Sequence, residues 1–192
     1  MLDQKEKMTA TIEFNTLPTK TQVRLIELSK LVDGVMPIET KTWKFATSTL
    51  QPSTETPTIV LEVAQWAGKE NIYLYTICLV TEQCDLSKIR IAFSEAKAMK
   101  KNGRAYPRLN SESCCFYVGS SEKMHQRLKE HLGYGTQGTY ALQLAHWASS
   151  FQIELEFKCA RYKAGHAREV YQALEDTLWD EMSPMFGRKG MK

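Results

Sequence analysis

Apolar residues recur at helical spacing in several segments of this chain. Residues 21–32 carry six such side chains and stop at Asp33-Gly34, which predicts an amphipathic helix. Thr56-Pro57 resembles a helix start with proline in the first turn, although the β-prone run 59–61 leaves a strand open as the alternative. Further helices are predicted over residues 87–101, 121–132, 139–149 and 166–182.

Three other segments have the composition or the alternation of β-strands. Ile72 to Val80 and Cys114 to Val118 are β-prone runs, and the second of them breaks at Gly119. Gln152 to Cys159 alternates strictly between apolar and polar residues, which is typical of a half-exposed strand. Residues 37–56 are rich in Pro, Thr and Ser and predict a loop, interrupted by a short extended piece around residues 43–45.

Length and composition point to an ordinary globular protein. A chain of 192 residues with 43% hydrophobic and 24% charged residues fits one main domain with an appended segment. No apolar run approaches the roughly 18 residues that span a bilayer, and residues 1–7 lack the apolar core of a secretory signal. We therefore expect a cytoplasmic protein without membrane contact. Five cysteines without a Cys-x-x-Cys pair argue against both a disulfide framework and a structural zinc site.

The net charge of +3 is small, but it is unevenly distributed. Residues 81–112 carry 7 basic and 4 acidic residues, and so hold +3 by themselves. A basic stripe in this segment is a candidate path for a nucleic-acid backbone, with a solvated helix face as the equally weighted alternative. Its members are Lys97, Lys100, Lys101, Arg104 and Arg108.

The candidate chemistry begins at the second predicted strand. Tyr117 ends that strand, Arg127 follows ten residues later, and His131 lies one helical turn beyond on the same helix face. A permanently charged arginine beside a tyrosine and a histidine suits phosphodiester chemistry. The spacing resembles the second half of the GIY-YIG nuclease signature, with Tyr117-Val118-Gly119 at the Tyr-Ile-Gly element and Arg127 at the family's arginine.

The resemblance extends over about residues 71–190. Asn71-Ile72-Tyr73 looks like the Gly-Ile-Tyr element with its glycine replaced, and Glu175 looks like the metal-binding glutamate. Pro184 follows nine residues after Glu175, as in the family, and an aromatic residue, Phe186, comes after it. Gly187 departs from the pattern, because the family usually has asparagine there.

This resemblance implies an α+β fold of the α/β sandwich-like kind. The expected domain, residues 71–192, has a small, mainly antiparallel three-stranded sheet flanked by helices. A helical N-terminal segment, residues 1–70, precedes it. The two signature tyrosines, Tyr73 and Tyr117, are 44 residues apart instead of about a dozen, so residues 81–112 are interpreted as a helical insertion between the first two strands.

The function implied by the resemblance is metal-dependent endonucleolytic cleavage of DNA. Glu175 is expected to hold Mg²⁺ or Mn²⁺, and Arg127 to contact a phosphate from the surface of the cleft. Tyr73 and Tyr117 are expected to face the site together. Tyr73 is the first choice for the group that activates water, with His131 as the alternative proton acceptor.

Two other functions remain open from the sequence. Asn71 and Gly187, which depart from the family pattern, are compatible with a nucleic-acid-binding module that has lost cleavage. A structural protein that docks on another protein through its basic insertion is the third possibility. A homodimer is expected if the protein makes concerted double-strand breaks, because one such site cuts one strand.

Overall fold

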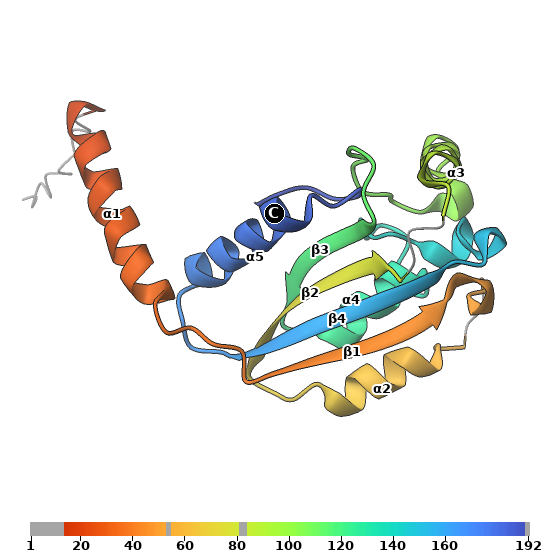
Figure 1. Cartoon of the computed structure of the whole chain (residues 1–192), viewed down its shortest axis with the longest axis horizontal. Coiled ribbons are helices and arrows are strands. Elements are labelled where there is room, and N and C mark those ends of the chain that lie inside the picture. Colours follow the sequence, from red (N-terminus) through yellow and green to blue (C-terminus); the bar gives the residue numbers. More distant parts are fainter. Residues whose placement is uncertain (1–13, 53–54, 81–83, 191–192) are drawn as a thin grey trace, which may run out of the picture. The chain divides into compact units, whose positions relative to one another are not determined.

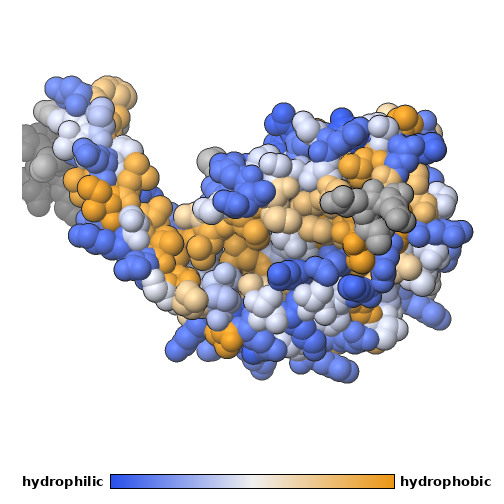
Figure 2. All heavy atoms as spheres, in the orientation of Figure 1, coloured by the Kyte–Doolittle hydropathy of each residue, from blue (hydrophilic) through white to orange (hydrophobic). Residues whose placement is uncertain are grey.

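A computed structural model describes residues 14–52, 55–80 and 84–190 of the chain. The chain divides after Val35 into two compact units, and each is described by itself. The first contains helix α1, Leu17–Val32, which confirms the predicted amphipathic helix and extends it toward the N-terminus. None of the residues of α1 is buried, and Figure 2 shows its hydrophobic side chains at the surface among hydrophilic ones. No helix among the described residues is long and apolar enough to cross a membrane.

The second unit has an α+β fold built on an antiparallel sheet. The sheet has four strands in the order β1-β4-β2-β3, not the three predicted, and every neighbouring pair is antiparallel. Its central strands are therefore β4 and β2, and β3 lies at an edge. The strands are β1 (Glu39–Ala46), β2 (Asn71–Leu79), β3 (Cys115–Ser121) and β4 (Glu154–Lys163).

Strand β1 is the element that the sequence did not predict in full. It pairs with β4 along its whole length, from Glu39 opposite Arg161 to Ala46 opposite Glu154. Trp43 and Phe45 bury their side chains, while Lys44 between them and the Thr and Lys residues before Trp43 stay exposed. The predicted boundary at residue 70 consequently falls inside the unit that begins at Met36, and this unit includes β1.

Helices cover both faces of this sheet (Figure 1). One face carries Tyr75, Ile77 and Phe157 on neighbouring central strands and is covered by α2 and α4. On the other face, α5 packs against β3. These helices are α2 (Thr58–Trp66), α4 (Met124–Leu132) and α5 (Arg168–Met182), all near their predicted positions.

The predicted insertion is packed into the core of the unit. Its helix α3, Leu86–Ala98, buries Phe93 against Phe186, with ring centroids 4.3 Å apart. The returning loop is tied to the C-terminal segment, because the Asn110 side-chain amide donates to the carbonyls of Pro184 (3.0 Å) and Gly187 (3.2 Å). The insertion therefore fixes the position of the segment after α5.

The helix predicted over residues 139–149 is wrong. The segment contains two short 3₁₀ turns, Leu144–His146 and Ser149–Phe151, preceded by Gln143 in the left-handed region at φ 58°. Residues 141–148 are all buried, so the apolar residues do not form a stripe on one side of a helix.

We predict that His146 makes the stability of the fold depend on pH. Its Nδ1 accepts from the Asn102 amide (2.7 Å), its Nε2 donates to the Gly133 carbonyl (2.9 Å), and burial lowers its pKa. The unfolded chain therefore binds a proton that the folded chain does not, and stability should fall as the pH drops below about 6.5. Urea denaturation of wild type and His146→Gln measures this slope. Parallel pH profiles for the two proteins would contradict it.

Candidate active site at the edge of the sheet

A groove of about 1290 Å³ runs along the edge strand β3. Its lining comes from β3, α4 and α5, from the insertion loop and from the two segments around residues 140 and 188. Six basic and three acidic residues line it, so the groove has a net charge of +3. The basic residues are Lys97, Arg108, Lys123, Arg127, Arg168 and Arg188, and the acidic ones are Glu122, Glu130 and Glu175.

Arg127 on α4 is the most heavily bonded side chain of the groove. Its Nε donates to the Tyr75 hydroxyl (3.3 Å), and one terminal nitrogen donates to Glu130 (2.8 Å). The other terminal nitrogen donates to the Tyr117 hydroxyl (3.1 Å) and to the Tyr140 carbonyl (3.1 Å). Four of its five N–H groups thus have a protein partner. The side chain is only 14% exposed, so the expectation that its head lies at the surface of the cleft is wrong.

Tyr75, not Tyr73, is the tyrosine of β2 that meets Arg127. Tyr75 stacks on Tyr117 with ring centroids 6.1 Å apart, and both hydroxyls accept from Arg127. Tyr73 is buried against Trp66 of α2, and its hydroxyl donates to the Gly68 carbonyl (3.0 Å). The two tyrosines are two residues apart in a strand, so both point to the same face of the sheet. The tyrosine that pairs with Tyr117 therefore lies two residues further along β2 than predicted, at Tyr75 instead of Tyr73.

His131 lies beneath these residues and is fully buried. Its Nδ1 accepts from the Leu142 backbone N–H (3.3 Å), so that nitrogen carries no proton. Its Nε2, 2.8 Å from the Tyr75 hydroxyl oxygen, therefore carries the proton and donates to Tyr75. Both ring nitrogens are engaged within the protein, and His131 is placed to orient Tyr75 instead of accepting a proton from water.

Two glycines allow the rings of the site to pack this closely. Gly119 lies opposite Tyr75 in the β2–β3 register, and a Cβ there would come within 2.8 Å of the Tyr75 hydroxyl. Gly187, at φ +112°, lies against the Tyr117 ring, where a Cβ would come within 3.1 Å. The departure from the family pattern at Gly187 therefore has a local reason, since a side chain there would press on Tyr117.

Glu175 enters the groove from α5, on the opposite side of β3 from Arg127. Its carboxylate accepts a short hydrogen bond from the Ser120 hydroxyl of β3. No cluster of three or more His, Cys, Asp or Glu residues suited to a metal ion exists among the described residues. A single carboxylate at the wall of an open groove nonetheless fits Mg²⁺, which keeps several waters and takes few protein ligands.

The predicted basic stripe is divided by the structure. Lys97 and Arg108 line the groove, whereas Lys100 and Lys101 are exposed outside it. Arg104 is partly buried and donates to the Gly135 carbonyl (2.7 Å) and the Gln143 side chain (3.3 Å), so it has a structural role. Several charged or aromatic residues that line the groove carry no sequence signal of the motif or the basic stripe, and neither does Tyr75, which is buried and bonds Arg127. The lining residues are Lys123, Glu130, Tyr140, Arg168 and Arg188.

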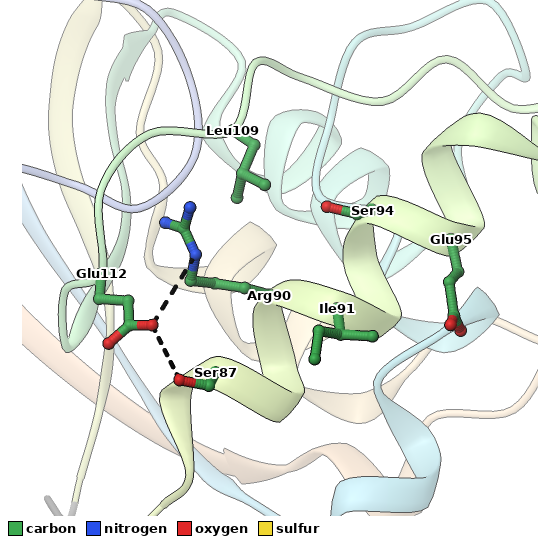
Figure 3. A pocket seen from close by; sticks show the side chains of 7 residues that line it. All are labelled: Ser87, Arg90, Ile91, Ser94, Glu95, Leu109 and Glu112. Atoms are coloured by element: carbon green, nitrogen blue, oxygen red, sulfur yellow. Dashed lines mark hydrogen bonds and ion pairs between the residues drawn. The ribbon is translucent and has the colours of Figure 1, made fainter.

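A second hollow, of about 430 Å³, lies between α3 and the loop that follows it (Figure 3). Three of its polar side chains, Ser87, Arg90 and Glu112, are paired with one another. Glu112 accepts from the Ser87 hydroxyl (3.0 Å) and forms an ion pair with Arg90 (4.0 Å), and Arg90 also donates to the Asn110 carbonyl. The groove along β3 is the better candidate site because its charges and tyrosines converge.

We predict that Arg127 is needed for stability as well as for function. Arg127→Ala leaves the Glu130 carboxylate, only 15% exposed, without its partner, and should lower the free energy of unfolding by about 3 kcal/mol. Arg168→Ala, at an exposed arginine of the same groove, should change it by less than about 0.5 kcal/mol. Urea denaturation of both variants measures the difference, and equal stabilities would contradict the buried network.

Searches with this chain found no matching family model, curated protein or solved structure. The function is therefore inferred from the side chains of the groove and from the signature resemblance.

Proposed function

We propose that this protein is a metal-dependent endonuclease that hydrolyses phosphodiester bonds of DNA in the groove along β3. The observation that carries the proposal is one arrangement: a guanidinium bonded to two tyrosine hydroxyls, with a carboxylate entering the same positively charged groove from the opposite helix. Charge of this sign attracts a polyanion, and an arginine beside a carboxylate meets the two electrostatic needs of phosphodiester cleavage.

The geometry supports the GIY-YIG resemblance with one change. The tyrosine that meets Tyr117 and Arg127 is Tyr75, so we assign the first signature element to Tyr73-Leu74-Tyr75 instead of Asn71-Ile72-Tyr73. In this assignment Tyr73 takes the glycine's place, and its side chain is accommodated against Trp66.

In the proposed reaction, Arg127 stabilises the charge that develops on the phosphoryl oxygens. Its position is fixed before substrate binds, because Glu130 and the Tyr140 carbonyl hold both terminal nitrogens. Once a phosphate is bound, such fixed donors need no further rearrangement at the moment of reaction. Bidentate binding of a phosphate requires that the Glu130 ion pair opens, because a phosphate that takes both terminal nitrogens must displace this carboxylate.

Glu175, oriented by Ser120, is the residue that would hold a divalent cation, together with oxygens of the substrate phosphate and water. A cation held there would supply Lewis-acid activation of the phosphate and would stabilise the leaving oxygen. The role of this chain is then to present one negative carboxylate at the wall of the groove that Arg127 also lines.

Tyr117 is our choice for the group that orients the attacking water. It lines the groove and is partly exposed, so water has access to its hydroxyl. Tyr75 is only 1% exposed, and burial raises its pKa well above the ordinary range despite the opposing charge of Arg127, so it stays protonated at neutral pH. We therefore assign Tyr75 and His131 to the positioning of Arg127 and Tyr117.

The test is nicking of supercoiled plasmid with Mg²⁺ or Mn²⁺ and with chelator as the metal-free control. Glu175→Gln keeps the hydrogen bond from Ser120 but removes the charge, and should abolish nicking while its urea denaturation midpoint stays close to that of wild type. Glu169→Gln, on the same helix and outside the groove lining, is the matched control and should retain full activity. Undiminished nicking by Glu175→Gln would overturn the mechanism.

Three hydroxyl deletions separate the roles of the tyrosines. Tyr117→Phe and Tyr75→Phe should each lower the single-turnover nicking rate, by roughly 100-fold and roughly 10-fold respectively, because only the first removes a hydroxyl that faces the groove. Tyr73→Phe should leave the rate unchanged, since its hydroxyl contacts Gly68 away from the site. A loss in Tyr73→Phe with none in Tyr75→Phe would restore the original assignment of the signature.

The alternative is a nucleic-acid-binding module of the same arrangement without cleavage. The burial of Tyr75 and the missing side chain at Gly187 favour it. Retention of DNA by wild type at low salt, with no metal-dependent nicking, would support this alternative. If cleavage is found, sedimentation of the protein in solution decides whether a homodimer brings two sites to the two strands.

A further inference from the structure

Tyr140 stands out among the aromatic side chains of the second unit. It is 69% exposed, whereas the other large aromatic residues described between Met36 and Gly190 are buried or partly buried. It lines the groove, and its own backbone carbonyl accepts from Arg127. The residue that carries this large exposed ring is therefore hydrogen-bonded, through its backbone, to the proposed phosphate-contacting residue.

The backbone that carries this ring is fastened on both sides. The Gln143 side chain donates to the Thr139 carbonyl (3.0 Å), and the Leu142 N–H donates to His131 (3.3 Å). Further back, Ala105 N–H donates to the Gln137 carbonyl (2.9 Å). Ala141 and Leu142, directly after Tyr140, are fully buried. Tyr140 is thus presented from a fixed position, and its side chain has only two torsion angles to restrict on binding.

We propose that Tyr140 is a stacking platform for an unpaired nucleobase next to the phosphate bound at Arg127. This inference rests on the proposed function and adds a substrate class to it: single-stranded DNA, or DNA with a base out of its stack near the cleaved bond. In a continuous duplex the faces of the bases are covered by their neighbours, so no face is open to the ring. Stacking on an aromatic ring is tolerant of base identity, so the contact selects structure more than sequence.

Binding is measured in the Glu175→Gln background without divalent ion, so that no substrate is cut. The probes are a fluorescently labelled oligothymidylate, an abasic oligomer of the same length, and a fully paired duplex. Tyr140→Ala should weaken oligothymidylate binding by roughly 5- to 100-fold and leave binding of the abasic oligomer unchanged, because the abasic chain offers phosphates without bases. Tyr140→Phe keeps the ring and should bind as the parent does.

Two further outcomes complete the test. The parent should bind oligothymidylate more tightly than duplex, and Tyr140→Ala should not change duplex binding. Equal loss of affinity for the oligothymidylate and the abasic oligomer, or no loss for either, would overturn the stacking role. Failure of the proposed cleavage is a separate result, because the binding difference between the two oligomers does not depend on any nicking by the wild-type protein.

Discussion

The arrangement of the candidate site depends on one buried cation. Arg127 joins the two strands that carry Tyr75 and Tyr117 to the helix that carries Glu130, and it also holds the segment of Tyr140. A guanidinium is charged at all accessible pH values, so burying it requires partners for its N–H groups. Each of these partners is thereby fixed in place, and the same residue that stabilises the fold organises the proposed chemistry.

Close packing around Tyr117 supplies the second constraint. The ring lies between Tyr75 and the backbone of Gly187, and the site tolerates no added carbon at Gly119 or Gly187 without movement of a ring. The C-terminal segment that supplies Gly187 is held by Asn110 of the insertion. The insertion between β2 and β3 therefore contributes to the site in two ways, through this anchor and through Lys97 and Arg108 in the groove lining.

The sequence predicted those elements whose side-chain pattern reflects a single buried face. Strand β4, with its strict alternation, and helix α4, which buries Met124, Leu128 and Leu132, are examples. Strand β1 is predicted only as a short extended piece around residues 43–45, because only Trp43 and Phe45 mark its buried side among Thr and Lys residues. Residues 139–149 predict a helix because they are rich in apolar residues, but residues 141–148 are all buried in irregular backbone. Periodicity cannot separate a buried irregular segment from a helix.

In the candidate site, too, the sequence predicts relations within one element but not those that depend on the pairing of two elements. Spacing along one helix placed Arg127 and His131 together correctly, because helical geometry fixes that relation. The choice between Tyr73 and Tyr75 depends on the register between β2 and β3, which the sequence does not state. In that register Gly119 lies opposite Tyr75, and its missing side chain makes room for the Tyr75 hydroxyl. Tyr140 had no motif to mark it, and only its exposure beside Arg127 reveals it.

The central claim is that nucleic acid binds in the groove at Arg127. The most direct measurement is a ¹⁵N–¹H spectrum of the arginine side chains in Glu175→Gln, with and without a short DNA oligonucleotide. If nucleic acid binds there, the Nε–H signal of Arg127 should shift on binding, together with those of the other groove arginines, while the signals of arginines of the same unit outside the groove should keep their positions. The first set is Arg108, Arg127, Arg168 and Arg188, and the second is Arg90, Arg104 and Arg161. An unchanged Arg127 signal at saturating oligonucleotide would show that nucleic acid does not bind in the groove at Arg127.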